Sequence, residues 1–303
     1  MVRIAVAGGF GDVGRTIVEV LGENSQNQVF TLSRKPVDKD FALCVDYDNV
    51  AGLHRVLEEN SIEVAISCLS ITDPTISKAE INLVRAAQLS SSTGRFIASQ
   101  WAIAAPPGSS PLPDFSVATL AELETTNLEY TIVSNGHFSD YYGYPKVKTY
   151  LRHADFLIDL KNKTAAIPGS GDDKVVFTYS FDVARFVGAL VSTSKSWPRR
   201  STIIGDKITM NELLDIAQEA RGAEFSVTYD GLEKLQALQV TELPSHIDAY
   251  QFFPKPILQT MFAVIGQWIM GGHFNLDYEG SLNEMFPHIK TKLTRDLIFE
   301  AWK

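Results

Sequence analysis

The chain has 303 residues, of which 45% are hydrophobic and 21% are charged, and its formal net charge at pH 7 is −9. This composition is typical of globular proteins and excludes a disordered or fibrous chain. An acidic chain without a basic run is a poor candidate for nucleic-acid binding, because neutralising a phosphate backbone requires clustered lysine and arginine. We therefore expect a globular protein that makes no nucleic-acid contact.

The first half of the chain alternates short apolar runs with helix-like segments. The apolar runs, which predict strands, are 3–7, 29–32, 43–46, 64–68, 95–98 and 130–134. The helix-like segments between them are 11–21, 50–59, 75–89 and 117–124. Short strands that are apolar throughout suit a parallel sheet covered on both faces. This alternation predicts an α/β fold, with a Rossmann-type doubly wound parallel sheet.

The pattern changes after about Tyr144. A turn-rich segment, Pro168–Asp173, is followed by an apolar run and by a helix-like segment that begins near Phe181. Most of the remaining chain reads as helix, with one lone strand expected at Ser226–Tyr229. We expect a smaller, mostly helical C-terminal substrate domain. The predicted Rossmann domain covers 1–144 with a return segment around 172–205, and the predicted substrate domain covers 145–171 and 206–303.

The longest apolar stretch, Ile257–Phe274, is interrupted by Gln259, Thr260 and Gln267. A membrane span needs about 20 nearly continuous apolar residues, so this stretch predicts a buried helix. The N-terminus enters a predicted strand without a cleavable signal pattern. The histidines have no ligand-like spacing, so no metal site is predicted. We expect a cytoplasmic protein without a membrane segment.

Four glycines follow the first predicted strand. In the sequence AGGFGDVG, from Ala7 to Gly14, the spacing G-x-G-x-x-G begins at Gly9 and the looser G-x-x-G-x-x-G begins at Gly8. Small residues let the backbone approach a pyrophosphate, whose charge then faces the N-terminus of the following helix. A dinucleotide is therefore predicted to bind here. The residues predicted to contact it are Gly8, Phe10, Gly11, Asp12, Val13 and Gly14.

The choice of dinucleotide is read at the end of the second predicted strand. An NAD site usually places an acidic residue there, but this chain has Ser33, Arg34 and Lys35. A guanidinium binds a phosphate through two parallel hydrogen bonds, and a neighbouring ammonium adds charge. The sequence therefore favours NADP(H) over NAD(H).

Several later segments match one known family in order along the chain. Phe96–Trp101 resembles the family's F-x-P-S-E-F/W segment, and Asn135–Tyr142 and Asp182–Phe186 follow at the expected places. The chain resembles the NmrA-like and isoflavone reductase-like atypical short-chain dehydrogenases/reductases, particularly fungal members. The resemblance implies a cleft between a Rossmann domain and a substrate domain. It also implies further cofactor contacts, at Ser70, Ser99, Gly136 and Phe138; a plain turn at Ser70 is an equally good interpretation.

The catalytic residues of this family are not all present. Isoflavone-type reductases carry a lysine about fifteen residues before the sixth strand, where this chain has Ser116. Tyr142 and Lys146 have the Tyr-x-x-x-Lys spacing, but a proline lies between them, so we interpret this match as chance. The candidates for proton donation are His137, with an ordinary pKa of about 6.5, and the phenols of Tyr141 and Tyr142. The alternative for His137 is a buried histidine or one that shapes the cofactor site, and the alternative for the two tyrosines is aromatic lining of the pocket.

Taken together, the residues and the resemblance lead to a functional hypothesis. We expect an NADPH-dependent reductase of a small aromatic or polyketide-like ketone, enone or imine, with a role in secondary metabolism. A non-catalytic regulator that senses NADP is one alternative, and it would explain Ser116. A redox-neutral isomerase, dehydratase or cyclase is the other, because one fold hosts many reactions.

Overall fold

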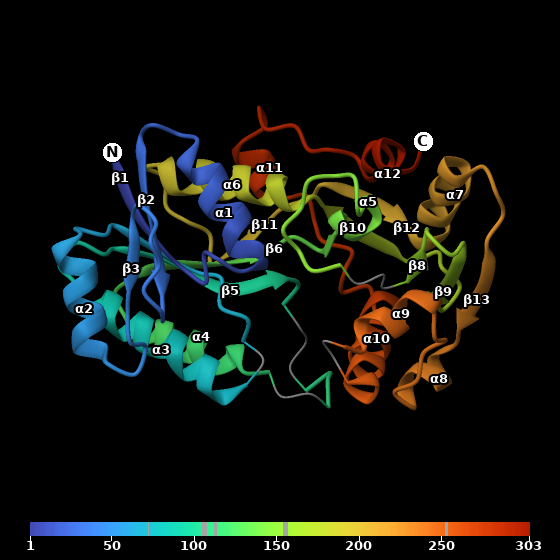
Figure 1. Cartoon of the computed structure of the whole chain (residues 1–303), viewed down its shortest axis with the longest axis horizontal. Helices are drawn as coiled ribbons and strands as arrows, with labels where there is room; N and C mark the ends of the chain where they lie inside the picture. Colours follow the sequence, from blue (N-terminus) through green and yellow to red (C-terminus); the bar gives the residue numbers. More distant parts are fainter. Residues whose placement is uncertain (72, 105–107, 112–113, 154–156, 252–253) are drawn as a thin grey trace. The chain divides into compact units, whose positions relative to one another are not determined.

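The computed structural model describes the chain except for residues 72, 105–107, 112–113, 154–156 and 252–253. The chain divides into two compact units, both drawn in Figure 1. Unit 1 consists of Met1–Trp101, Pro113–Ser134 and Val183–Ser201. Unit 2 consists of Ala102–Leu112, Asn135–Asp182 and Thr202–Lys303.

The two units differ from the expected domain ranges in four segments. Residues 102–112, 135–144, 172–182 and 202–205 were expected in the Rossmann domain but belong to unit 2. Strand pairing supplies a physical reason for two of them. Strand β7 (His137–Phe138) pairs in parallel with β10 (Lys174–Thr178), so these two segments share a small sheet of unit 2.

Unit 1 is built on a seven-stranded sheet with the order β11-β6-β5-β4-β1-β2-β3. The strands are β1 (Val2–Ala7), β2 (Asn27–Ser33), β3 (Ala42–Cys44), β4 (Val64–Ser67), β5 (Arg95–Ala102), β6 (Glu129–Ser134) and β11 (Arg200–Thr202). The pairs β1–β2, β1–β4, β2–β3 and β4–β5 are parallel. The strand order runs outward from β1 in both directions, which confirms the predicted doubly wound fold.

Helices cover both faces of this sheet. Figure 1 shows α2 (Val50–Glu59), α3 (Pro74–Leu89) and α4 (Ser116–Glu124) on one face, and α1 (Asp12–Gly22) and α6 (Ser180–Ser192) on the other. The four residues of β4 are all buried, and so are the last four of β1. Strands buried on both faces need apolar side chains at successive positions, which is the pattern that the sequence shows.

Strand β5 is longer than expected. The sequence predicted residues 95–98, but the strand continues to Ala102. Its neighbour β4 ends at Ser67, one residue after Ile66, which pairs with Ile97. Residues Ser99–Trp101 therefore extend past the end of β4, and we call this segment the β5 overhang.

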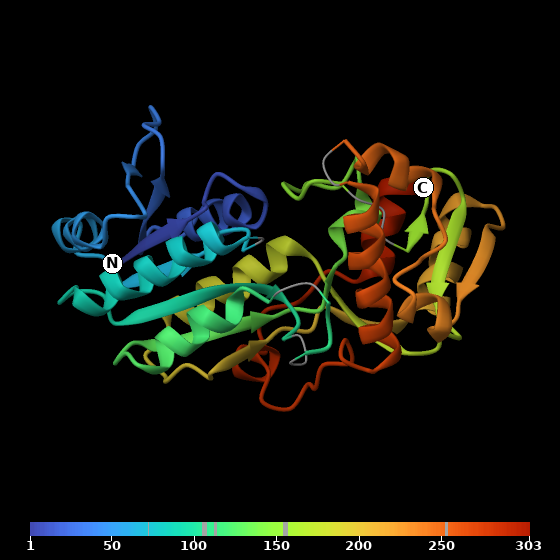
Figure 2. The ribbon, with the colours of Figure 1, turned by 90° about the horizontal axis from the view of Figure 1, so that it is seen from below.

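Unit 2 holds two three-stranded sheets, with the orders β12-β10-β7 and β13-β9-β8. Besides β7 and β10, the strands are β8 (Ile158–Asp159), β9 (Thr164–Pro168), β12 (Asp206–Thr209) and β13 (Ser226–Asp230). The expectation of a lone strand at Ser226–Tyr229 is wrong in one respect, because β13 pairs in parallel with β9 over five residues. Figure 2 shows these two strands side by side.

The helices of unit 2 pack on these sheets and on one another. They are α5 (Asp140–Gly143), α7 (Met210–Arg221), α8 (Leu232–Gln236), α9 (Pro244–Ala249), α10 (Lys255–Met270), α11 (Leu282–Met285) and α12 (Thr294–Trp302). Helix α10 occupies most of the long apolar stretch, and its residues Leu258, Phe262 and Ile269 are buried in the core, as predicted for a buried helix. No helix in the described part of the chain is long and apolar enough to cross a membrane.

Candidate functional site

The glycine-rich loop follows β1 and is held by close backbone contacts. Gly8 has a φ of 74°, and a Cβ atom there would lie 2.5 Å from the carbonyl oxygen of Cys68. A Cβ atom on Gly14 would lie 2.2 Å from the carbonyl oxygen of Gly8. Both distances are shorter than any normal contact, so only glycine fits at these two positions. The third glycine of the motif thus lets α1 pack closely on the loop, as the dinucleotide motif requires.

The loop leads directly into the first turn of α1. Gly11 is the N-cap residue, and no side chain caps the helix there. Gly11 and Phe10 are exposed, Asp12 and Val13 are half-buried, and Gly14 is buried. The free N–H groups of a first helical turn carry a partial positive charge that favours a phosphate. The geometry that the sequence predicted is therefore present, with an exposed loop in front of an uncapped helix.

The segment Ser33–Lys35 lies at the same edge of the sheet. Ala7 pairs with Leu32 across parallel strands, so the residues that follow β1 and β2 emerge side by side. The side chains of Arg34 and Lys35 are exposed, and Ser33 Oγ accepts a hydrogen bond of 3.2 Å from the Lys35 amide. Two cations thus stand next to the glycine loop, where a 2′-phosphate would need them.

Lys39 is a residue of this region that the sequence analysis missed. Its ammonium nitrogen lies 5.5 Å from the centre of the Phe10 ring, in the glycine loop. This contact brings the loop after β2 over the loop after β1. No local motif marks Lys39, because the contact depends on how the two loops fold towards each other.

The β5 overhang holds Ser99, which the resemblance places beside the nicotinamide. The Ser99 hydroxyl donates a hydrogen bond of 2.6 Å to the carbonyl oxygen of Leu69. The Ser99 amide donates one of 2.8 Å to Oε1 of Glu80, a buried residue on α3. Ser70 follows Leu69 and is exposed. Ser99 is therefore fixed in place by two bonds to elements outside its own strand.

Ser116, which stands where the family carries its lysine, is the first residue of α4. The Ser116 hydroxyl donates a 2.6 Å hydrogen bond to Oδ1 of Asp114. It also accepts a long hydrogen bond of 3.4 Å from the side-chain amide of Gln100. These groups carry no positive charge. The charged group that the resemblance implies at this position is therefore absent from Ser116 and its two described partners.

Gly136 opens the loop that follows β6, in unit 2. Its φ is 69°, and a Cβ atom there would lie 2.2 Å from the carbonyl oxygen of Val176. The amides of Asn135 and Gly136 both donate to the carbonyl oxygen of Ala102. Internal packing alone therefore explains this glycine, and its cofactor contact, like that of the buried Phe138, stays a prediction.

His137 lies in an aromatic environment. The centre of its ring is 5.3 Å from that of Tyr141, 5.8 Å from that of Tyr142 and 5.7 Å from that of Phe177. Desolvation by burial lowers the pKa of His137 to about 4. The imidazole is consequently neutral at pH 7. This changes the sequence-based expectation, since a neutral imidazole offers a single N–H donor instead of an acidic imidazolium.

The two tyrosines that follow differ in burial. Tyr142 is 0% exposed and belongs to the hydrophobic core of unit 2, whereas Tyr141 is only half-buried. Burial in the core favours aromatic packing for Tyr142, and its role as a proton donor stays a prediction. Tyr141 remains a candidate. The chance match of Tyr142 with Lys146 also has no helical basis, since α5 ends at Gly143.

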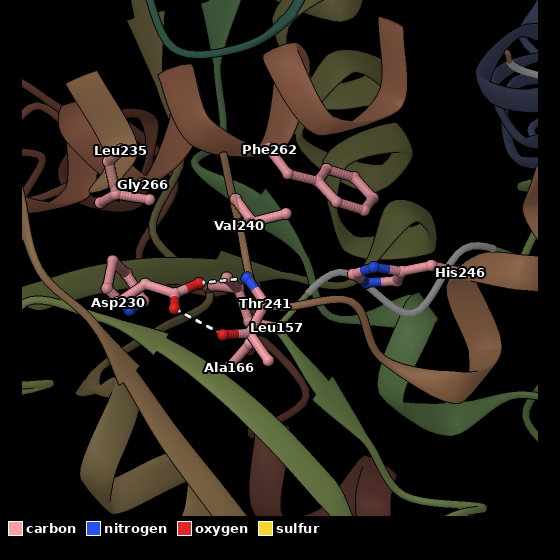
Figure 3. A pocket seen from close by; sticks show the side chains of 10 residues that line it. Leu157, Ala166, Asp230, Leu235, Val240, Thr241, His246, Phe262 and Gly266 are labelled. Carbon is pink, nitrogen blue, oxygen red and sulfur yellow. Dashed lines mark hydrogen bonds between the residues drawn. The ribbon is translucent and has the colours of Figure 1, made fainter. Parts of the chain in front are cut away.

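Figure 3 shows a small hollow inside unit 2, between α10 and the sheet that contains β9. Its volume is about 250 Å³, which includes open solvent. The carboxylate of Asp230 lines the hollow and accepts hydrogen bonds of 2.7 Å from the amide and the hydroxyl of Thr241. This polar side chain is therefore already bonded to another part of the protein. We assign no ligand to this hollow. Within the described ranges, no group of three or more metal-ligating side chains is arranged to hold an ion.

Solved structures with the same fold include reductases and a nucleoside-diphosphate-sugar epimerase from Staphylococcus aureus. A leucoanthocyanidin reductase from Vitis vinifera, in complex with NADPH, superimposes with a TM-score of 0.73 at 15% identity, over 98% of each chain. A structure of AtPrR2 with NADP+ and (+)pinoresinol gives a TM-score of 0.73 at 18% identity, again over 98% of each chain. At such identities the likeness shows the fold alone.

Curated relatives are closer in sequence. Oxidoreductase BOA1 of Botryotinia fuckeliana is 32% identical over 301 residues, covering 95% of this chain and 96% of the relative. Oxidoreductase swnN of Metarhizium robertsii is 27% identical over 336 residues, covering 100% of this chain and 98% of the relative. No family model matches the chain. The full-length similarity to fungal oxidoreductases, on this fold, shows that the chain belongs to the NmrA-like, isoflavone reductase-like family of oxidoreductases.

Proposed function

We propose that the protein is an NADPH-dependent reductase of a small aromatic or polyketide-like ketone, enone or imine, acting in the cytoplasm in secondary metabolism. The observation that carries the proposal is the register of β1 and β2. Pairing of Ala7 with Leu32 brings the glycine loop and the Arg34–Lys35 pair to one edge of the sheet. An uncapped helix start and two exposed cations together suit a dinucleotide with an extra phosphate.

The binding roles follow from the chemistry of each group. The loop Gly8–Gly14 and the first turn of α1 would hold the pyrophosphate, and Ser33, Arg34, Lys35 and Lys39 would surround the 2′-phosphate. When bound, NADPH supplies the hydride. The plant structures with NADPH and NADP+ support this choice of cofactor for the present chain.

The chain's own contribution to the reaction is orientation and a hydrogen bond to the substrate oxygen. Tyr141 is half-buried and lies 5.3 Å, ring centre to ring centre, from His137. The phenol would donate a hydrogen bond to the substrate oxygen and pass its proton to it as the hydride arrives, and the phenolate would then be reprotonated from water. The neutral His137 beside it offers one N–H or one lone pair. We therefore assign the donor role to Tyr141 and a supporting role to His137. Substrates with an aromatic ring would suit aromatic surroundings of this kind. The structure of AtPrR2 with NADP+ and (+)pinoresinol supports this substrate class.

The proposal is tested by calorimetric titration with NADPH and NADH, followed by NADPH oxidation with a panel of aromatic ketones, enones and imines. We expect NADPH to bind more tightly than NADH, by about tenfold or more, and at least one class of carbonyl or imine to be reduced. Binding without any NADPH oxidation would contradict the reductase and support a redox-neutral enzyme or an NADP sensor. The absence of binding would contradict the cofactor assignment itself.

A further inference from the structure

Glu80 is a buried acid that the proposed reaction does not use. It lies in the middle of α3 and is 0% exposed. Burial raises the pKa of its carboxyl, against the opposite effect of the hydrogen bond from the Ser99 amide. Burying an acid lowers the stability of the fold, and an apolar side chain of similar size at the same position is often more stabilising. Packing alone therefore does not explain why a carboxyl group occupies this buried position.

The β5 overhang supplies an explanation. The pairing of β4 with β5 is described up to Ile66 and Ile97, and Ser99 lies two residues beyond it. Oε1 of Glu80 accepts the Ser99 amide at 2.8 Å, so a side chain of α3 holds the backbone of the overhang. An amide N–H without an acceptor is destabilising where water is largely excluded, so this bond stabilises the overhang. Two further bonds hold the segment, from Ser99 Oγ to Leu69 and from Trp101 Nε1 to Ser67.

The same carboxyl also holds α4. Its second oxygen, Oε2, accepts a 2.8 Å hydrogen bond from the hydroxyl of Thr119, which is buried on α4. One turn earlier on α3, Ser77 donates a 2.8 Å bond to the carbonyl oxygen of Phe115, immediately before α4 begins. Helix α4 starts with Ser116, the position that carries a lysine in related reductases. Glu80 thus joins three elements of unit 1, namely α3, β5 and α4.

We propose that Glu80 is a positioning residue, whose buried carboxyl fixes Ser99 and the start of α4 so that unit 1 binds the nicotinamide half of the cofactor. This inference rests on the proposed function, since it assumes that the protein binds NADPH. In the sheet order, β4 and β5 lie on the opposite side of β1 from β2, where the second half of a dinucleotide would bind. The adenosine half would be bound by the loops after β1 and β2, and Glu80 makes no described hydrogen bond to them. The role therefore predicts a selective effect on one half of the cofactor.

The experiment compares two ligands in the same variant. The probes are NADPH and adenosine 2′,5′-bisphosphate, which carries the adenosine and its 2′-phosphate but no nicotinamide. In Glu80→Leu, the Ser99 amide and the Thr119 hydroxyl both lose their acceptor. We expect NADPH affinity to fall about tenfold or more, and bisphosphate affinity to stay within about twofold of wild type. Glu80→Gln, whose amide oxygen can still accept the Ser99 N–H, is expected to restore most of the NADPH affinity.

Two further variants complete the design. Thr119→Val removes one of the two bonds and keeps the shape of the side chain, so it tests the role if Glu80→Leu does not fold; we expect NADPH affinity to fall about threefold, with no change for the bisphosphate. Asp159→Asn alters a buried acid of unit 2 that accepts bonds from Asn162 and Ser245. It is the matched control, and the ratio of the two affinities should not change in it.

The outcomes separate the two proposals. If wild type binds neither ligand, the proposed function fails. If wild type binds NADPH but Glu80→Leu and Thr119→Val weaken both ligands equally, Glu80 is merely structural and the positioning role is overturned. Unchanged affinity for both ligands in these variants would overturn it as well. A loss confined to NADPH, with rescue by glutamine, would support it.

Discussion

Two glycine turns share the same backbone geometry but belong to different units of the chain. Gly8 comes after β1 with a φ of 74°, and Gly136 comes after β6 with a φ of 69°. Both are enforced by a nearby carbonyl oxygen, of Cys68 in one case and of Val176 in the other. A glycine at such a position therefore indicates only that two backbone segments approach each other closely.

The elements that the two glycines introduce are different. After Gly8, the chain enters an eleven-residue helix without a side-chain cap, beside the exposed cations Arg34 and Lys35. After Gly136, it enters a two-residue strand whose His137 is surrounded by aromatic rings and is neutral at pH 7. The first environment suits an anion, and the second suits an uncharged ring. A glycine motif thus gains functional meaning only from the element that it introduces.

The largest expected effect is a difference in the free energy of unfolding between substitutions in the two turns. Gly136→Ala forces a Cβ atom into Val176, so we expect the free energy of unfolding to fall by about 2–4 kcal/mol. Gly11→Ala meets only the carbonyl oxygen of Gly8, at 3.2 Å, and has no positive φ. It should lower stability by less than about 1 kcal/mol but weaken NADPH binding about tenfold, because the backbone can no longer approach the pyrophosphate. Urea denaturation and calorimetry measure the two effects. If Gly136→Ala and Gly11→Ala lowered the free energy of unfolding equally, the proposed difference between the two turns would be wrong.

The second prediction concerns the charge beside the first turn. Arg34→Ala should reduce NADPH affinity by about tenfold to a hundredfold, since a charge-assisted, two-pronged contact is worth roughly 1.5–3 kcal/mol. NADH affinity should change by less than about threefold. Arg55→Ala, which removes an exposed arginine from α2 in the same unit, is the control. If NADH binding weakened as much as NADPH binding, Arg34 would not be binding the 2′-phosphate selectively.

The third prediction tests the neutral character of the second turn through pH. The pKa of His137 is about 4 in the folded protein and about 6.5 in the unfolded chain, so the unfolded chain binds more protons between these values. Stability should therefore fall as pH decreases from about 6.5 to about 4, and this contribution is of order 2 kcal/mol. Urea titrations of His137→Asn should show a shallower slope in this window. An unchanged slope in the variant would contradict a lowered pKa at His137.

The smallest effect distinguishes the two tyrosines beside His137. Tyr141→Phe should lower kcat about tenfold, with little change in NADPH affinity, because it removes the assigned hydrogen-bond donor. Tyr142→Phe should leave kcat within about twofold, since its ring is enclosed in the core. Steady-state rates with the best substrate of the panel measure both. A larger loss in Tyr142→Phe would mean that the core position takes part in the reaction after all.

The sequence predicted the fold and the first turn because both depend on local signals. Alternating apolar runs identify β1 and β4 as strands buried on both faces, and the glycine spacing requires only a strand before it and a helix after it. The adjacency of Arg34 to this loop follows from parallel pairing, which the fold class already implies. The contacts of these residues with a cofactor stay predictions.

The parts that the sequence did not predict depend on long-range contacts. The β5 overhang continues the strand because Glu80, nineteen residues earlier in the chain, accepts the amide of Ser99. Strand β13 pairs with β9, more than fifty residues away, so its apolar pattern alone indicated a lone strand. The burial of Tyr142 depends on core packing against Phe177 and other residues, and it distinguishes two adjacent tyrosines that read alike in the sequence.

The chain passes between the two units five times, after Trp101, Leu112, Ser134, Asp182 and Ser201. During synthesis, the large sheet therefore lacks its edge strand β11 until residues 200–202 have left the ribosome. Domains usually fold as units from the N-terminus onward, but here neither unit is a continuous stretch of chain. Nascent chains ending near residue 150 would expose the unpaired side of β6. Recombination at a single point could likewise not exchange one unit for that of a relative, because each unit consists of three separate stretches of the chain.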